Sequence, residues 1–277
     1  MARMTLKLIL PIALASLAGG IVLAQRTARD ADGGTNLMPT WTNDPEFAKD
    51  VFTFVRGKYT VNGRHGWGHT PPDERWAIDF PDGDLNLSFR LQQMTSMKVS
   101  PDGLALGFTE KELFEYPFIY IVEAGKLTFE DEEIAPLRKY LLNGGFMMVD
   151  DFWGDRDWFA FEEEIKLLFP DREVIDLPDD HPIFSGIFPL NEKPQIPNIR
   201  SWERSRRTYD RLGPGSEEAH YRAVLDDKKR IMVLICHNTD LGDGWEREGD
   251  NEEYFHRFSE KQAYPLGINI IFYAMTH

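Results

Sequence analysis

The chain has 277 residues, of which 42% are hydrophobic, so it can bury a sizeable core. It carries 46 acidic and 31 basic residues, a net charge of −15, which disfavours nucleic acid or an anionic lipid surface as a partner. The one cysteine, Cys236, cannot form an internal disulfide, and its apolar surroundings in "RIMVLIC" favour a buried, inert thiol over a nucleophile.

The first 50 residues predict export followed by a tether. Two basic residues precede an uncharged, mostly apolar run, and "VLA" before Gln25 fits a cleavage site, so 1–24 is predicted to be a signal peptide. An uncleaved membrane anchor is the alternative, because the run is close to the length that spans a bilayer. Residues 25–50 are polar and predict a linker. We therefore expect one α/β domain over 51–277, periplasmic or extracellular, with no membrane span after cleavage.

From residue 51 the chain alternates between strand and helix patterns. "VFTFVRGKY" predicts a strand that ends near Arg56, and "FIYIVEAG" and "FMMVDD" predict strands covered on both faces. "DLNLSFRLQQM" fits a helix that Asp84 would cap, although its apolar residues also alternate as they do in a strand. "DEEIAPLRKYLLNGG" predicts a helix, and so does "DWFAFEEEIKLLF", with Asp157 as a candidate N-cap.

The last third of the chain completes the pattern. "EVIDL" predicts a short strand, "YRAVLDD" and "RIMVLICHN" predict a hairpin, and "YPLGINIIFYAMTH" predicts a buried terminal helix. Buried strands that alternate with helices are typical of α/β proteins. The expected fold is a doubly wound, mostly parallel sheet with helices on both faces, flavodoxin-like, with a β-hairpin extension.

Several segments together resemble one bacterial family. These segments are "FVRGKY", "WAIDFPDGDLNLSFRLQQMT", "FIYIVEAGKLTFEDEEIAPLRKYLLNGGFMMVDDFWG", "DHPIFSGIF" and "YPLGINIIFYAMTH". From about residue 51 to the end, the chain resembles the family called domain of unknown function 4159. The resemblance implies a branch of the class I glutamine amidotransferase-like fold, related to the trehalose-utilisation (ThuA-like) proteins, and it implies no activity.

One departure from the amidotransferases bears on the chemistry. Glutamine amidotransferases of this fold carry a catalytic cysteine in the sharp turn after a central strand. The corresponding turn here is "VDDFWGD", which has neither a cysteine nor a G-x-S-x-G nucleophile elbow. Amidotransferase and serine-hydrolase activities are therefore disfavoured.

The carboxyl ends of the predicted strands define the candidate site, because ligands bind there in open parallel sheets. The candidate ligand-binding residues are Arg56, Glu123, Trp153, His237, Asn238 and Asp240, and the candidate catalytic residues are Asp150, Asp151 and His181. Adjacent strand residues point to opposite faces, so only one of Asp150 and Asp151 should enter the crevice unless the strand ends between them. When two carboxylates lie close together, one can act as a general acid and the other as a general base. The alternatives are a structural ion pair with Arg56 or Arg156, or a cation site.

Other polar motifs give weaker signals. Asp240 and Asp243 lie in a glycine-bearing loop without the spacing of an EF-hand, and His65 and His69 lie among glycines and prolines that disfavour a helix. We therefore predict no metal and no cofactor. Four tryptophans fall in expected loops, which suits a sugar face or a protein interface: Trp67, Trp76, Trp153 and Trp245.

Three functions remain open from the sequence. The first is an exported, non-catalytic module that binds a small polar ligand, such as a sugar, or a partner at the strand ends. The second is a carbohydrate-acting hydrolase or isomerase-like enzyme that uses Asp150 or Asp151 with Arg56 and His181. The third is an interaction subunit of a cell-envelope assembly, with an envelope protein as its partner.

Overall fold

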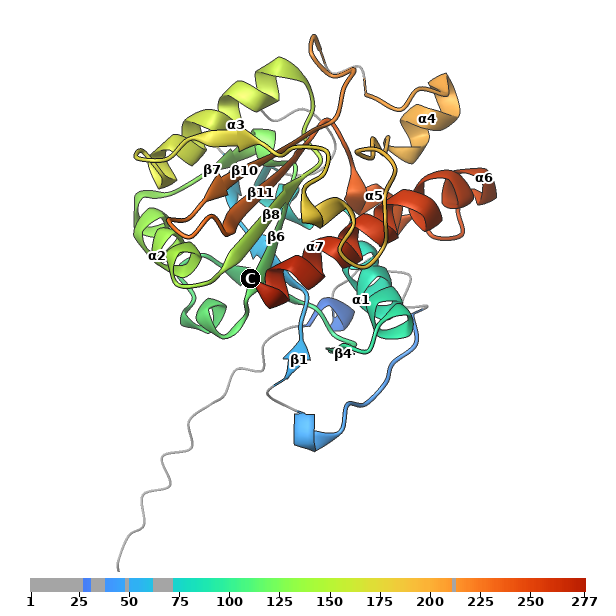
Figure 1. Cartoon of the computed structure of the whole chain (residues 1–277), viewed down its shortest axis with the longest axis horizontal. Coiled ribbons are helices and arrows are strands. Elements are labelled where there is room, and N and C mark those ends of the chain that lie inside the picture. Colours follow the sequence, from blue (N-terminus) through green and yellow to red (C-terminus); the bar gives the residue numbers. More distant parts are fainter. Residues whose placement is uncertain (1–26, 31–37, 48–49, 62–71, 211–212) are drawn as a thin grey trace, which may run out of the picture.

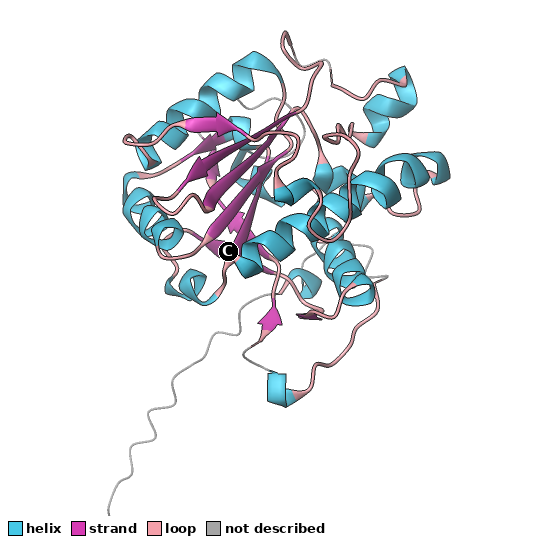
Figure 2. Ribbon diagram, viewed as in Figure 1, coloured by secondary structure: helices cyan, strands magenta, loops and turns pink. Residues whose placement is uncertain are grey.

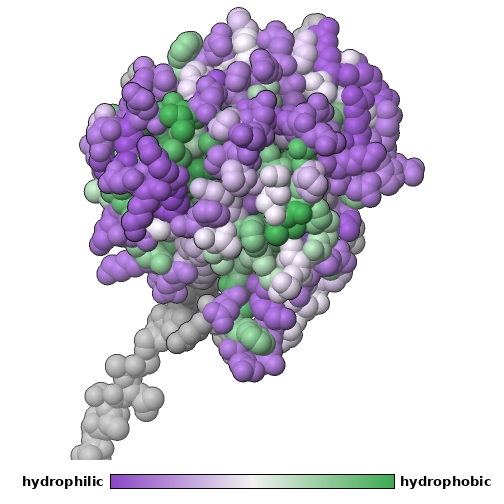
Figure 3. Space-filling view, in the orientation of Figure 1, coloured by the Kyte–Doolittle hydropathy of each residue, from purple (hydrophilic) through white to green (hydrophobic). Residues whose placement is uncertain are grey.

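A computed structural model describes residues 27–30, 38–47, 50–61, 72–210 and 213–277 (Figure 1). The predicted signal peptide, His65, His69 and Trp67 lie outside these described residues. Among the described residues, no helix combines the length and apolar character needed to cross a membrane. Figure 3 shows a largely hydrophilic face, in keeping with the charged composition.

A seven-stranded sheet forms the centre of the molecule (Figure 2). Its strands, in spatial order, are β5 (Leu104–Gly107), β2 (Val55–Lys58), β6 (Phe118–Val122), β8 (Phe146–Asp150), β11 (Ile231–His237), β10 (His220–Leu225) and β9 (Val174–Asp176). The neighbouring strands from β5 to β11 are parallel, and β10 runs antiparallel to both of its neighbours. The prediction of an α/β protein with a mostly parallel sheet is confirmed.

Two small sheets flank the large one. Strand β1 (Val51–Phe52) pairs in parallel with β4 (Lys98–Val99), and β3 (Thr60–Val61) pairs antiparallel with β7 (Leu127–Thr128). The expected hairpin is β10–β11, and its second strand lies inside the large sheet, where it pairs in parallel with β8. The hairpin therefore belongs to the central sheet.

Helices pack on both faces of this sheet (Figure 1). The helices are α1 (Asp82–Met94), α2 (Asp131–Leu142), α3 (Gly154–Leu168), α4 (Ile199–Ser205), α5 (Leu241–Glu246), α6 (Glu252–Tyr254) and α7 (Tyr264–Thr276). The 3₁₀ turns are η1 (Ala28–Asp30), η2 (Pro45–Phe47), η3 (Pro72–Ala77), η4 (Lys111–Glu115), η5 (Ala124–Lys126) and η6 (Pro182–Phe184), and Phe255–Ala263 (η7) is a π-helix that leads into α7.

The strands separate two cores because their successive side chains point to opposite faces. Tyr120 and Met148 pack with the face that carries α1, α5 and α7. Ile119 and Val149 pack with α2 and α3 on the other face. Strands that are apolar on both faces are therefore buried between two helical layers, as their continuous apolar sequences predict.

Three local predictions are corrected. Strand β2 continues to Lys58, so Arg56 lies inside the strand and not at its carboxyl end. Helix α1 begins at Asp82, so Asp84 is not a cap, and its buried carboxylate pairs with Arg56. Helix α3 begins at Gly154, so Asp157 lies in the first turn, where its carboxylate accepts a hydrogen bond from Lys126 Nζ at 2.7 Å.

Described parts of the expected linker contact the α/β core. The backbone N–H of Ala28 donates to the carbonyl of Gly103 at 2.7 Å, and Arg29 Nε lies 2.8 Å from a carboxylate oxygen of Asp102. Trp41 Nε1 donates to the carbonyl of Val99 at 2.7 Å. These pieces of 25–50 are thus held against the strand region by backbone and side-chain hydrogen bonds.

Candidate functional site

Three neighbouring parallel strands end in the same backbone conformation. Glu123 follows β6, Asp151 follows β8 and Asn238 follows β11, with φ angles of 49°, 52° and 62°. Positive φ is uncommon in residues other than glycine and costs conformational energy, and such positions cluster at functional sites. The carboxyl edge of the sheet therefore concentrates backbone strain in three adjacent turns.

A cavity of about 420 Å³ lies at this edge of the sheet. Its lining residues are Arg75, Glu123, Lys126, Asp151, Phe152, Trp153, Arg156, Asp157, Asn198, Asp210 and Asp240. They come from the turns after β6, β8 and β11, from η3 and η5, from the start of α3, and from the two ends of the α4 segment. Four of the predicted site residues line it: Glu123, Asp151, Trp153 and Asp240.

Ion pairs organise one side of the cavity. Arg75 Nη1 lies 2.5 Å from Glu123 Oε2, and Lys126 Nζ lies 2.7 Å from Asp157 Oδ1. Trp153, which is the N-cap of α3, donates its indole N–H to Asp151 Oδ1 at 2.9 Å. This side therefore presents both hydrogen-bond donors and acceptors to the cavity.

Three carboxylates lie close together at this edge of the sheet. One oxygen each of Asp79, Asp151 and Asp240 lies within 4.8 Å of the other two. Burial, and then the charges of Glu123 and Asp150, raise the pKa of Asp151 well above its usual range. Burial and the charges of Asp151 and Asp243 raise the pKa of Asp240 in the same direction.

Asp150 lies directly behind this group, because β8 ends between Asp150 and Asp151. Its side chain is 0% exposed, and its Oδ2 accepts hydrogen bonds from the Tyr120 hydroxyl and the Gly242 amide, each at 3.0 Å. Burial raises the pKa of Asp150 to about 7, against the lowering effect of these hydrogen bonds. Asp150 therefore supports the wall of the cavity, and Asp151 lines it.

Two predicted site residues act as parts of the framework. Asn238 Oδ1 accepts from the Gly154 amide at 2.8 Å, and its Nδ2 donates to the carbonyls of Gly215 and Glu218, each at 2.7 Å. His237 points to the α3 face, where Nε2 lies 3.2 Å from the Gly154 carbonyl. Both side chains thus fix the start of α3, and neither lines the cavity.

Arg56 and His181 also lie away from the cavity. Arg56 is 1% exposed, and its guanidinium bonds to Asp84 and to the carbonyls of Trp76 and Ile78. The ring of His181 packs at a tilt against Tyr273, whose hydroxyl accepts a hydrogen bond from the amide at the start of β11. His181 is therefore near the amino ends of the strands, at the opposite edge of the sheet.

The family model for the domain of unknown function DUF4159 matches residues 60–275. The chain belongs to this family. The match covers most of the described α/β region, including every turn that lines the cavity. No curated protein matches this DUF4159 chain.

The sequence did not predict Arg75 and Asp210, which line the cavity of this DUF4159 protein, or Asp79, which lies beside Asp151 and Asp240. Asp79 and Arg75 lie in the segment between β3 and α1, and Asp210 follows α4. Because the predicted strand stopped at Arg56, the segment after β2 was not recognised as part of the strand-end edge. The acid-rich run "AIDFPDGD" ahead of a helix was the signal that could have identified Asp79.

Proposed function

We propose that this protein binds a small polar ligand, such as a sugar, in the cavity at the carboxyl ends of β6, β8 and β11. The observation that carries the proposal is the convergence of Glu123, Asp151, Trp153 and Asp240 on one cavity of about 420 Å³. Ligand sites in open α/β sheets lie at this edge, and a few convergent polar groups fix the orientation of the ligand.

The mixed polarity of the lining favours a neutral, hydroxyl-rich ligand. Arg75, Lys126 and Arg156 contribute N–H donors, and Asp151 and Asp240 contribute acceptors. A hydroxyl group both donates and accepts hydrogen bonds, so it can pair with either side. An anionic ligand would lie close to the carboxylates of Asp79, Asp151 and Asp240, which repel it.

A carbohydrate-acting hydrolase is the second candidate, and one observation favours it. Asp151 lies in the turn between β8 and α3 with a φ of 52°, where amidotransferase-like folds carry a nucleophile. Burial, and then the charges of Glu123 and Asp150, raise its pKa, which is the direction that a general acid requires. Arg56 and His181 have no part in this candidate reaction, because both lie away from the cavity.

A thermal-shift screen with Asp151→Asn tests the binding proposal. Glucose, galactose, N-acetylglucosamine and trehalose are added to the wild-type protein, and at least one should raise the Tm by about 2–5 °C at saturation. Asp151→Asn should lose most of that rise, because the substitution replaces one acceptor oxygen with an NH₂ donor and removes the ionisable group. Release of reducing sugar from oligosaccharides would separate the hydrolase from the binding module.

The matched control is Asp227→Asn. This aspartate is 91% exposed and lies in the turn between β10 and β11, at the opposite edge of the sheet. Its variant should keep the full sugar-dependent rise. If no sugar shifts the Tm, or if Asp151→Asn responds as the wild type does, the proposed site is wrong.

We also propose that the fold is flavodoxin-like and related to the amidotransferase-like proteins. Taken in chain order, the five strands β2, β5, β6, β8 and β11 occupy the spatial order 2-1-3-4-5, which is the order of flavodoxin-like sheets and supports the proposal. The connection from β2 to β5 places α1 on one face, and the connection from β6 to β8 places α2 on the other. The cavity lies at the strand ends next to this change of face.

Export is proposed from the sequence alone. The basic start, the apolar run and the "VLA" motif support cleavage after residue 24. N-terminal sequencing of the mature protein from an expressing bacterial cell should begin at Gln25, and a mature chain that begins at the initiator would contradict cleavage.

A further inference from the structure

Three carboxylates at the carboxyl edge of the sheet form no ion pair with the described residues, and two of them line the cavity. These are Asp79, Asp151 and Asp240, whose nearest oxygens lie within 4.8 Å of one another. Among the described residues none of the three forms an ion pair, whereas Arg75 and Lys126, which also line the cavity, are paired with other carboxylates. Three like charges at this separation oppose one another unless a positive charge lies between them.

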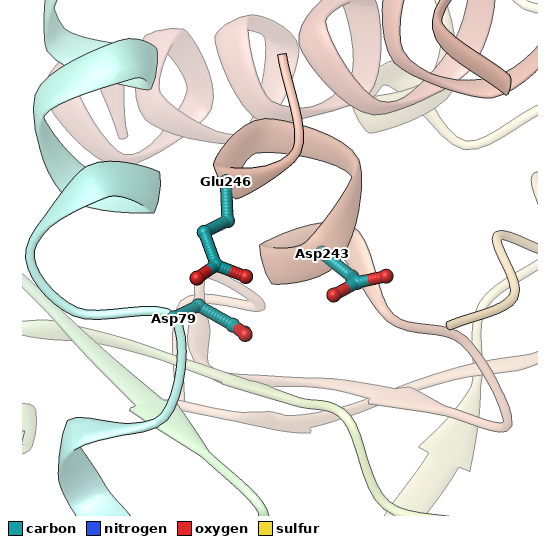
Figure 4. Close-up of side chains that lie close together, drawn as sticks. All are labelled: Asp79, Asp243 and Glu246. Atoms are coloured by element: carbon teal, nitrogen blue, oxygen red, sulfur yellow. The ribbon is translucent and has the colours of Figure 1, made fainter. Parts of the chain in front are cut away.

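A second acidic group shares Asp79 but is already neutralised in part. Figure 4 shows Glu246 reaching toward Asp79, with Asp243 on the neighbouring turn of α5. Arg247 Nε lies 2.7 Å from Glu246 Oε2 and 3.4 Å from Asp243 Oδ1. This second group therefore has a cation of its own, and the group on the cavity wall does not.

Unpaired buried oxygens point to a missing partner at the same place. Asp79 Oδ2, Asp150 Oδ1 and Asp210 Oδ1 are buried and accept no hydrogen bond from the described residues. Asp210 lines the cavity, and Asp79 belongs to the carboxylate group itself. A buried polar atom without a hydrogen-bond partner costs free energy. Three such atoms in one region therefore indicate that a ligand binds there.

Asp150 lies outside the three-carboxylate group and gives separate evidence for a ligand there. It is 0% exposed, and its Oδ2 accepts from the amide of Gly242, while a Cβ built on Gly242 would overlap Asp79 Oδ2. The carboxylates of Asp150 and Asp79 therefore meet around Gly242. The negative charge of Asp150 also acts on Asp151 and Asp240. A wholly buried carboxylate with one unpaired oxygen thus lies next to Asp151 in the chain and shares Gly242 as a neighbour with Asp79.

We propose that Asp79, Asp151 and Asp240 bind a hard divalent cation of the Ca²⁺ or Mg²⁺ class. All the donors are carboxylate oxygens, which suit these ions better than softer metals. Asp240 Oδ1 caps α5 through the Asp243 amide, and Asp151 Oδ1 accepts from Trp153, so each retains a second oxygen for the cation. Water and ligand oxygens would complete the coordination from the cavity side.

The cation would also contribute to the ligand binding proposed above. Its role in holding that ligand rests on the proposed function, whereas the cation site itself does not. A divalent ion on this wall would coordinate hydroxyl oxygens of a molecule held in the cavity. The cation can be titrated alone, without any sugar. Failure of the cation site and failure of sugar binding are therefore separate results.

The test is calorimetric titration of the full chain, stripped with chelator, with CaCl₂, MgCl₂ or MnCl₂ alone. One saturable site is expected for at least one of these ions. Asp79→Asn, Asp151→Asn and Asp240→Asn should each weaken its affinity at least 10-fold. The substitutions keep side-chain shape, and asparagine also caps helices well, so folding is preserved. Each variant should melt no lower than the wild type in chelator, because it removes a repulsive charge.

Two controls locate the site. Glu246→Gln changes the neighbouring group, and Asp227→Asn changes the opposite edge of the sheet, and both should bind the cation with wild-type affinity. The proposal is overturned if the wild type binds none of the three ions at millimolar concentration. It is also overturned if Asp151→Asn and Asp240→Asn bind as the wild type does, or if only Glu246→Gln loses binding.

Discussion

Asp150 and Asp151 are neighbours in sequence with different surroundings, because the strand ends between them. Asp150 keeps the strand direction and enters the core under α5, where Tyr120 and Gly242 hold it. Asp151 turns into the left-handed region and lines the cavity beside Trp153. Because the strand ends between them, two adjacent aspartates have different roles: Asp150 supports the cavity wall, and Asp151 is a candidate ligand-binding residue.

His237 gives the clearest pH prediction at the residue scale. Burial, together with the charges of Arg222 and His220, lowers the pKa of His237 from 6.5 to about 3, because its two ring nitrogens suit only the neutral imidazole. The unfolded chain then binds a proton below pH 6.5 that the folded chain does not. The stability that the neutral His237 provides is complete above pH 6.5 and is lost progressively as the pH falls toward 3.

Urea unfolding of the wild type and of His237→Asn at pH 8 and pH 4 measures this effect. The wild type should lose about 3 kcal/mol more than the variant between these two pH values. The comparison removes the contributions of the other titrating groups, which both proteins share. Equal losses in the two proteins would show that His237 is protonated in the folded state.

At the scale of elements, close packing of η5 against α3 forms one side of the cavity. Lys126 of η5 pairs with Asp157 of α3, and Gly125 allows the approach. A Cβ on Gly125 would overlap the Cβ of Asp157. The turn after β6 and the helix after β8 are therefore held together where Glu123 and Asp151 line the cavity.

Gly125→Ala should destabilise the protein by about 1–3 kcal/mol in urea unfolding, because the added methyl group overpacks this contact. Gly83→Ala in α1 is the matched control. Its nearest neighbours lie at 3.5 Å, so the added methyl group fits, and it should stabilise the helix by about 0.5–1 kcal/mol. If Gly125→Ala left the free energy of unfolding unchanged, α3 would be able to shift away from η5 without loss of stability.

The strands were predictable from the sequence where they are apolar, and less so where they carry charge. "FIYIV" and "FMMV" are buried on both faces and could form only central strands. In β2, Arg56 lies inside the sheet because Asp84 from α1 neutralises its charge. This partner is 28 residues away, so no local sequence pattern predicts it. The end of β2 was therefore placed too early.

At the scale of the whole molecule, the topology assembles the site from distant segments. The strand-end rule selected Glu123, Asp151, Trp153 and Asp240, because those turns directly follow parallel strands. It also selected His237, whose side chain the strand alternation turns to the α3 face. Asp210 reaches the cavity, and Asp79 reaches the neighbouring carboxylates, from long connections whose tertiary packing cannot be predicted from periodicity.

The central claim is that a polar ligand occupies this cavity, and amide chemical-shift mapping by NMR tests it most directly. The spectrum is recorded with and without the sugar that gives the largest thermal shift. The account predicts that the shifted amides gather in 123–126, 151–157 and 240–243. Shifts that gather instead at the opposite edge, in 143–145 and 226–230, or spread evenly over the surface, would contradict it.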